Sequence, residues 1–128
     1  MTIDIKKFRF RNFQMYKDAR KFSVFMKKLS KIKFPKDEQF NLLSQLWRAF
    51  DSVVLNIAEG SDRGTDKDFA HFLNNAHTSL NEVVACTDVA LDSAYLTESD
   101  HSQCLHEAEK VANQLTAFRK SLLSRPSK

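Results

Sequence analysis

The chain has 128 residues, 42% of them apolar, which is enough for one domain with a single hydrophobic core. Only two glycines and two prolines occur, whereas an all-β domain of this size needs many tight turns, so the composition disfavours that class and favours helices. The net charge of +4 is unevenly distributed: residues 1–36 hold 12 Lys and Arg against Asp4 and Asp18, a balance of +10, and residues 37–128 carry −6.

Three features bear on the cellular compartment and on membrane insertion. The cysteines, Cys86 and Cys104, form no CxxC motif, and reduced thiols in the cytoplasm are their simplest interpretation. Residues 1–13 carry charges at short intervals and lack the apolar stretch of a signal peptide. No apolar run reaches the roughly 18 residues of a membrane-spanning helix. We therefore expect a cytoplasmic protein without a membrane segment.

Residues 1–12 are predicted to form a short, extended, basic N-terminal arm. Apolar and basic residues alternate there, and a period of two is typical of extended chain: Ile3, Ile5, Phe8 and Phe10 lie among Lys6, Lys7, Arg9 and Arg11. In one interpretation the aromatic rings stack on bases and the cations neutralise phosphates. In another, the apolar residues dock on a neighbouring subunit. A third, a membrane-surface role, is poorly served by this alternation.

An amphipathic helix is expected over residues 13–32, with Asn12 as its N-cap. Apolar residues recur on one face at steps of three or four: Met15, Ala19, Phe22, Phe25 or Met26, Leu29 and Ile32. Five basic residues of this helix join those of the arm as candidate nucleic-acid-binding residues: Lys17, Arg20, Lys21, Lys27 and Lys28. Phe34-Pro35 ends the helix, because the residue before a proline disfavours helical geometry.

Three further helices are expected, over residues 37–59, 66–95 and 99–123, followed by a frayed tail at 124–128. Gly60 would end the second helix in the left-handed conformation. Thr65 or Asp66 would cap the third helix, whose inward stripe runs to Ala94, and Thr97 or Ser99 the fourth. Four long helices joined by short loops predict an all-α protein, an up-down-up-down antiparallel four-helix bundle over residues 13–123.

A polar stripe follows the second helix beside its apolar face. Its members are three or four residues apart: Gln45, Arg48, Ser52, Asn56 and Glu59. One interpretation is a hydrogen-bonded network that sets the register of the bundle or of a subunit interface. The other is a ligand or nucleic-acid surface that uses Arg48 and Arg63.

Sequence motifs in this region are also distinctive. They comprise Phe34-Pro35, Glu38, Gln45, Arg48-Ala49, Ser52, the NIAEG run Asn56–Gly60, Arg63, Phe69, Phe72-Leu73 and Ser79–Glu82. Over residues 13–120 the chain resembles the four-helix-bundle proteins encoded by intervening sequences of bacterial 23S rRNA genes. It departs from that family's pattern at Trp47, Phe50 and Thr78, where larger side chains lie near the predicted seam between helices.

The resemblance implies a bundle that assembles as a ring-shaped homopentamer. It extends to the accessory variability proteins of diversity-generating retroelements, whose basic surfaces bind nucleic acid and a reverse transcriptase. No catalytic activity is implied. The resemblance therefore makes the motif residues structural or interface positions: Gln45, Arg48, Ser52, Asn56, Glu59 and Arg63.

The residues themselves offer little for catalysis or metal binding. His101 and Cys104 share a helical face, but His106 lies about 140° away from His101, so no metal site is expected. No P-loop, dinucleotide fingerprint or HExxH motif occurs. We expect neither an enzyme nor a cofactor protein.

Two functions remain open on these grounds. The first is a non-enzymatic homo-oligomeric, pentameric bundle whose basic surface binds RNA or DNA, as an accessory subunit of a nucleic-acid enzyme such as a reverse transcriptase. The alternative is a structural or protein-interaction scaffold without affinity for nucleic acid.

Overall fold

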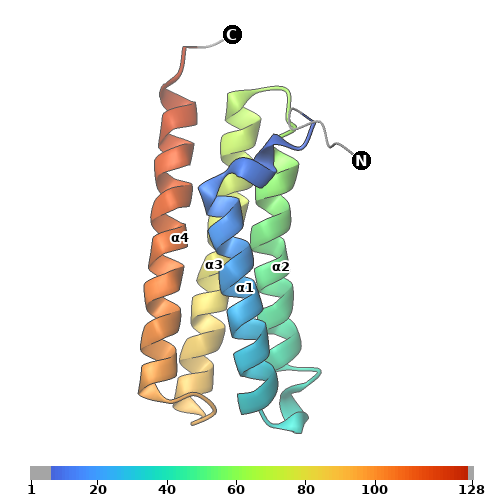
Figure 1. Ribbon diagram of the computed structural model, residues 1–128, viewed down its shortest axis with the longest axis vertical. Helices are drawn as coiled ribbons and strands as arrows, with labels where there is room; N and C mark the ends of the chain where they lie inside the picture. Colours follow the sequence, from blue (N-terminus) through green and yellow to red (C-terminus); the bar gives the residue numbers. More distant parts are fainter. Residues whose placement is uncertain (1–6, 127–128) are drawn as a thin grey trace.

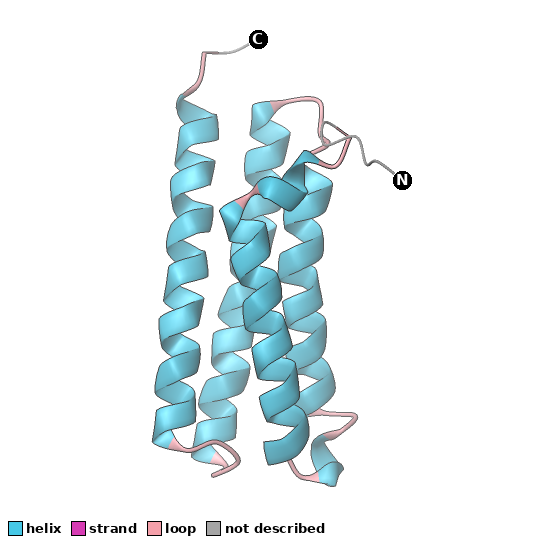
Figure 2. Cartoon of the chain, in the orientation of Figure 1, coloured by secondary structure: helices cyan, strands magenta, loops and turns pink. Residues whose placement is uncertain are grey.

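The computed structural model describes residues 7–126 and is dominated by four long antiparallel helices (Figure 1). They are α1 (Gln14–Lys33), α2 (Leu42–Gly60), α3 (Asp66–Asp92) and α4 (Glu98–Ser124), with two short 3-10 helices, η1 (Arg9–Asn12) and η2 (Lys36–Glu38). Within residues 7–126 there is no strand (Figure 2). Helices α1 and α3 each pack against α2 and α4, so they lie on a diagonal. The predicted all-α four-helix bundle is confirmed.

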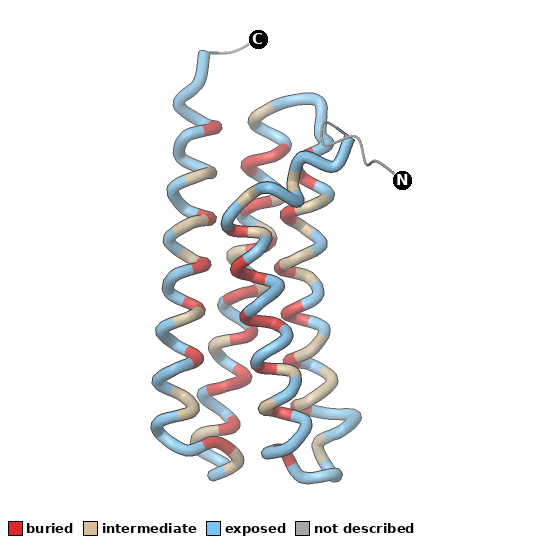
Figure 3. Tube along the Cα trace, in the orientation of Figure 1, coloured by how far each residue is buried: buried red, intermediate tan, exposed pale blue. Residues whose placement is uncertain are grey.

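The buried residues lie on the inward faces of all four helices (Figure 3). Phe22 of α1 meets Phe50 of α2 edge to face, with ring centroids 4.8 Å apart. Most residues of the predicted apolar stripes lie in this core, but Ile32 is 80% exposed and Phe25 is on the surface. None of the helices in the described part of the chain is long and apolar enough to cross a membrane.

The caps predicted for α3 and α4 are present. Thr65 accepts a hydrogen bond from the backbone N–H of Asp68 at 3.1 Å. Thr97 and Asp100 form a capping box, each side chain accepting from the other's backbone N–H. These reciprocal hydrogen bonds satisfy N–H groups that the helix itself leaves unpaired, and sequence identifies them because they depend on neighbouring residues alone.

The predicted arm is not extended where the structure describes it. Residues 9–12 form η1, and Phe13, not Asn12, precedes α1, without a side-chain cap. Phe10 packs edge to face on Tyr16 with centroids 5.0 Å apart, a contact that a curled backbone permits. Residues 1–6, including Lys6, lie outside the described residues.

The second helix begins later than expected, at Leu42, after η2 and a turn. The Glu38 carboxylate accepts hydrogen bonds from the backbone N–H of Leu42 at 3.3 Å and from the hydroxyl of Tyr95 at 2.7 Å. The hydrogen bond to Glu38 raises the pKa of the Tyr95 phenol. Glu38 therefore anchors this connection to the start of α2 and to the α3–α4 turn.

The turn after α3 also differs from the prediction. The helix ends at Asp92, and Ala94 is exposed with a φ of 62°, not directed into the core. The N–H groups of Tyr95 and Leu96 then return to the carbonyl of Ala90. A non-glycine residue thus takes the left-handed position, which sequence would assign to glycine.

Gly60 is required for a different reason from the predicted one. It is the last residue of α2, and no glycine in the described range has a positive φ. A Cβ on Gly60 would lie 2.6 Å from Cβ of Phe72 and 3.0 Å from Cδ1 of Phe69. The missing side chain therefore permits the close approach of α2 and α3.

We expect Gly60→Ala to destabilise the protein. Overpacking against a neighbouring Cβ costs about 1–3 kcal/mol, which exceeds the roughly 0.5–1 kcal/mol by which alanine favours a helix over glycine. Gly64→Ala is the matched control, since nothing lies within 4 Å of its added Cβ. Urea denaturation of both variants measures the difference; equal stability of Gly60→Ala and wild type would contradict the close approach.

A buried carboxylate links α1 to α4. Asp18 is only 6% exposed and accepts hydrogen bonds from Gln14 at 3.0 Å and Gln114 at 2.7 Å, with Lys110 3.7 Å away. Burial raises the pKa of this carboxyl, but the hydrogen bonds from Gln114 and Gln14, with Lys110 and Lys21 nearby, outweigh burial and lower the pKa below 3.8.

Asp18→Asn is expected to cost about 1–3 kcal/mol of unfolding free energy at neutral pH, because the amide leaves one buried donor without an acceptor. Since folding lowers the Asp18 pKa, the wild-type advantage is complete above the ordinary value of 3.8 and is lost as pH falls through the folded-state value. Denaturation from pH 7 to pH 2 measures this, with exposed Glu109→Gln as the control. A pH-independent difference would contradict the carboxylate's role.

Candidate nucleic-acid interface

The outward side of α1 carries four exposed cations on one helical face. Together with two apolar residues they line a shallow groove of about 580 Å³: Lys17, Arg20, Lys21, Val24, Phe25 and Lys28. Their steps of three and four place them on the same side of the helix. We call this set the α1 basic face. No acidic residue within residues 7–126 lines the groove.

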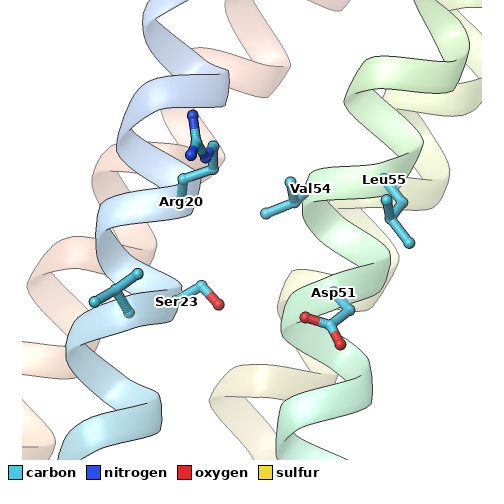
Figure 4. Close-up of a pocket in the computed structure, with 6 residues that line it drawn as sticks. Arg20, Ser23, Asp51, Val54 and Leu55 are labelled. Carbon is cyan, nitrogen blue, oxygen red and sulfur yellow. The ribbon is translucent and has the colours of Figure 1, made fainter. Parts of the chain in front are cut away.

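A second hollow, of about 240 Å³, lies between α1 and α2. Figure 4 shows Arg20 and Ser23 of α1 opposite Val54 and Asp51 of α2. Its apolar rim is open to solvent, since Val24 is 53% and Leu55 63% exposed. Because Arg20 and Val24 also belong to the α1 basic face, the two hollows form one continuous surface.

A third and larger groove, of about 610 Å³, lies where α1, η2 and the start of α2 meet. We call it the Trp47 groove; its lining residues include Lys31, Phe34, Lys36, Phe40, Trp47 and Arg48. It adjoins the second hollow through Asp51, which lines both. Sequence analysis did not identify this groove, because its members come from a helix, a turn and a second helix.

Two of the predicted nucleic-acid-binding residues form a hydrogen bond or an ion pair inside the protein. Arg9 donates a hydrogen bond to the carbonyl of Ser61 at 2.7 Å, and its guanidinium lies 5.5 Å from the ring centroid of Phe13. Lys27 forms an ion pair with Asp51 and lies 5.6 Å from the centroid of Trp47. Arg9 thus joins η1 to the α2–α3 connection, and Lys27 joins α1 to α2.

The remaining predicted cations within residues 7–126 are exposed, and among them Arg20 lies over the ring of Tyr16, 5.5 Å from its centroid. Lys17, Arg20, Lys21 and Lys28 are brought together on the α1 basic face. Lys7 and Arg11 are also exposed. Arg11 belongs to η1, which lies across one end of the bundle (Figure 1).

The predicted polar stripe on α2 forms a smaller network than its spacing indicated. The Ser52 and Ser79 hydroxyls lie 2.7 Å apart, and Asn56 donates to the Ser52 carbonyl at 2.8 Å. The contact between Ser52 and Ser79 joins α2 to α3. Three other members are exposed and make no side-chain hydrogen bond within residues 7–126: Gln45, Arg48 and Glu59. Arg63 instead lies over the ring of Phe72, 4.9 Å from its centroid.

Residues 11–117 match the family described as 23S rRNA-intervening sequence protein. The chain belongs to this family. A solved structure from Bacteroides thetaiotaomicron, a protein of unknown function from the S23 ribosomal protein family, has the same fold. The two share 21% identity with a TM-score of 0.76, over 83% of this chain and 95% of the other. No curated protein matches the sequence.

The three residues predicted to depart from the family's sequence pattern lie in separate places. Phe50 is buried in the core against Phe22. Trp47 is half-buried between α1 and α2 and donates from its indole N–H to the Ser30 hydroxyl at 3.0 Å. Thr78 is exposed and donates to the carbonyl of Asn74. Phe50 and Trp47 therefore both contribute large side chains to the contact between α1 and α2.

The cysteines and histidines do not gather into a group of metal ligands within residues 7–126. Both cysteines are free and buried, and burial raises the pKa of the Cys104 thiol to about 11. A thiol that stays protonated at neutral pH is a weak nucleophile and a poor metal ligand. His101 pairs with Asp88 at 2.7 Å, and no group of three potential metal ligands occurs in the described part.

Proposed function

We propose that this member of the family is a non-enzymatic nucleic-acid-binding protein whose α1 basic face contacts the phosphate backbone. The observation that supports this most is the alignment of Lys17, Arg20, Lys21 and Lys28 along one exposed groove without an acidic lining residue. From Lys17 to Lys28 the helix rises about 16 Å. That length matches about five nucleotide steps of 3.4 Å. The family's description refers to 23S rRNA, which makes RNA the first ligand to test.

The alternative, a scaffold without affinity for nucleic acid, uses the same surface for an acidic protein partner. The scaffold predicts no binding of nucleic acid. If nucleic acid does bind, the salt dependence of its affinity counts the phosphate contacts, because each neutralised phosphate releases a defined number of counterions. Four contacts give a slope of log K against log salt of about −3 for a single strand and about −4 for a duplex.

Replacing Lys17, Lys21 and Lys28 by alanine is expected to weaken RNA binding and to make the slope shallower by about 2 to 3, because three phosphate contacts are lost. Fluorescence anisotropy with a labelled RNA between 50 and 200 mM salt measures both quantities. The matched control replaces Lys67, Arg119 and Lys120, which are exposed on α3 and α4, and should retain more of the affinity. Absence of binding by wild type would favour the scaffold.

The proposal includes a homo-oligomer, pentameric as the family resemblance implies, that holds nucleic acid for an enzyme such as a reverse transcriptase. Val89 and Leu105 are exposed apolar residues on α3 and α4, outside the α1 basic face, and we propose them as candidate subunit contacts.

Light scattering is expected to give a mass near that of five 14.8 kDa chains, about 74 kDa. The mass should rise when RNA is added at low salt and return to its initial value as salt increases. A particle of one chain that still gains RNA would contradict the oligomer and retain the binding proposal.

A further inference from the structure

We propose that the Trp47 groove binds an unpaired base of a single-stranded nucleic acid, so that the protein prefers single strands to duplexes. This inference rests on the proposed function and specifies its ligand. Single-strand-binding proteins commonly combine aromatic rings, on which bases stack, with cations that follow the backbone. The groove brings both kinds of residue together.

The aromatic part of the groove is held in place by the fold. Phe34 is buried and its ring packs on Tyr95, with centroids 5.6 Å apart. The Trp47 indole is oriented by its hydrogen bond to Ser30, a residue with no exposed surface, whose hydroxyl in turn donates to the carbonyl of Lys27. A ring fixed in advance loses little conformational entropy when a base stacks on it.

Phe40 is the residue that the fold itself does not account for. It is 85% exposed, yet it lines the groove. The backbone that carries it is anchored: the N–H of Asn41 donates to the carbonyl of Glu38, and the Glu38 carboxylate accepts from Leu42 and Tyr95. An exposed aromatic side chain on an anchored turn is suited to stacking on a ligand, not to filling the core.

The charges around the groove suit a nucleotide. Lys31, Lys36 and Arg48 line it, and Asp51, the one acidic residue among its described lining, is paired with Lys27. Each nucleotide of a single strand supplies one phosphate for these cations and one free base for the rings. In a duplex the bases are stacked on each other and do not present their faces.

The size and position of the groove are also consistent with this ligand. Its volume of about 610 Å³ lies within the ~300–1,000 Å³ of small-molecule sites. Through Asp51, Arg20 and Val24 it is continuous with the α1 basic face. A strand whose phosphates lie on α1 therefore passes next to the groove, with the Lys27–Asp51 ion pair between the two surfaces.

Trp47 is the single tryptophan of the chain, so its fluorescence reports directly on the groove. The test titrates the wild-type protein with a ten-nucleotide oligouridylate and with a blunt RNA duplex of ten base pairs. We expect the single strand to quench Trp47 emission and to bind more tightly than the duplex. Phe40→Leu should weaken single-strand binding by about 5- to 150-fold, which corresponds to the ~1–3 kcal/mol of one stacked base.

Matched variants separate stacking from other effects. Phe40→Tyr keeps an aromatic ring and should retain single-strand binding. Leu123→Ala removes an exposed apolar side chain from α4 and should change the affinity for neither the single strand nor the duplex. Duplex binding should stay the same in all three variants, because the α1 basic face is intact.

Three results would overturn the inference. The first is equal affinity for both RNAs, without quenching and without an effect of Phe40→Leu. It would assign binding to the α1 basic face alone and exclude the groove as a base-binding site. A fall in particle mass in Phe40→Leu with unchanged RNA affinity would assign the groove to a second copy of the chain. Failure of the wild type to bind either RNA would overturn the proposed function as well.

Discussion

The close approach of α2 and α3 at Gly60 is the constraint on which the arrangement of the bundle depends. A glycine there lets the Phe72 and Phe69 side chains pack directly on the end of α2. The Ser52–Ser79 hydrogen bond joins the same two helices farther along. Large side chains fill the contact between α1 and α2 instead, with Phe22 on Phe50 and Trp47 against Ser30. Bulky residues between two cylinders keep them apart and leave hollows along their outer edges, which is where the surface grooves occur.

Much of the fold could be predicted from sequence because it depends on local periodicity. Apolar residues at steps of three and four identified all four helices, and the Thr65 and Thr97 caps followed from residue type and position. The errors concern contacts that helical periodicity does not describe. The pattern around Phe10 is typical of extended chain, but residues 9–12 form η1 and Phe10 packs on Tyr16. Gly60 matches a helix terminator, but its neighbours are side chains of α3.

The candidate site was predictable to the same extent and for the same reason. Helical spacing placed Lys17, Lys21 and Lys28 on a common face, and the structure brings them together. Helical spacing could not distinguish these lysines from Arg9 and Lys27. The partners of Arg9 and Lys27, Ser61 and Asp51, are far away in sequence. Phe40 was missed because the sequence placed it inside the helix expected over residues 37–59, whereas it lies in the turn before α2.

The inner face of α1 determines where its outer face points. Asp18 holds the first half of the helix to α4 through Gln114, and Ser30 holds the second half to α2 through Trp47. These two contacts with different neighbours fix the rotation of α1 about its axis. Because the exposed cations alternate with the buried residues along the same helix, fixing one face orients the other. Asp18 is thus a structural residue with a consequence for binding: its burial against α4 keeps Lys17 and Lys21, its neighbours on the helix, directed towards solvent.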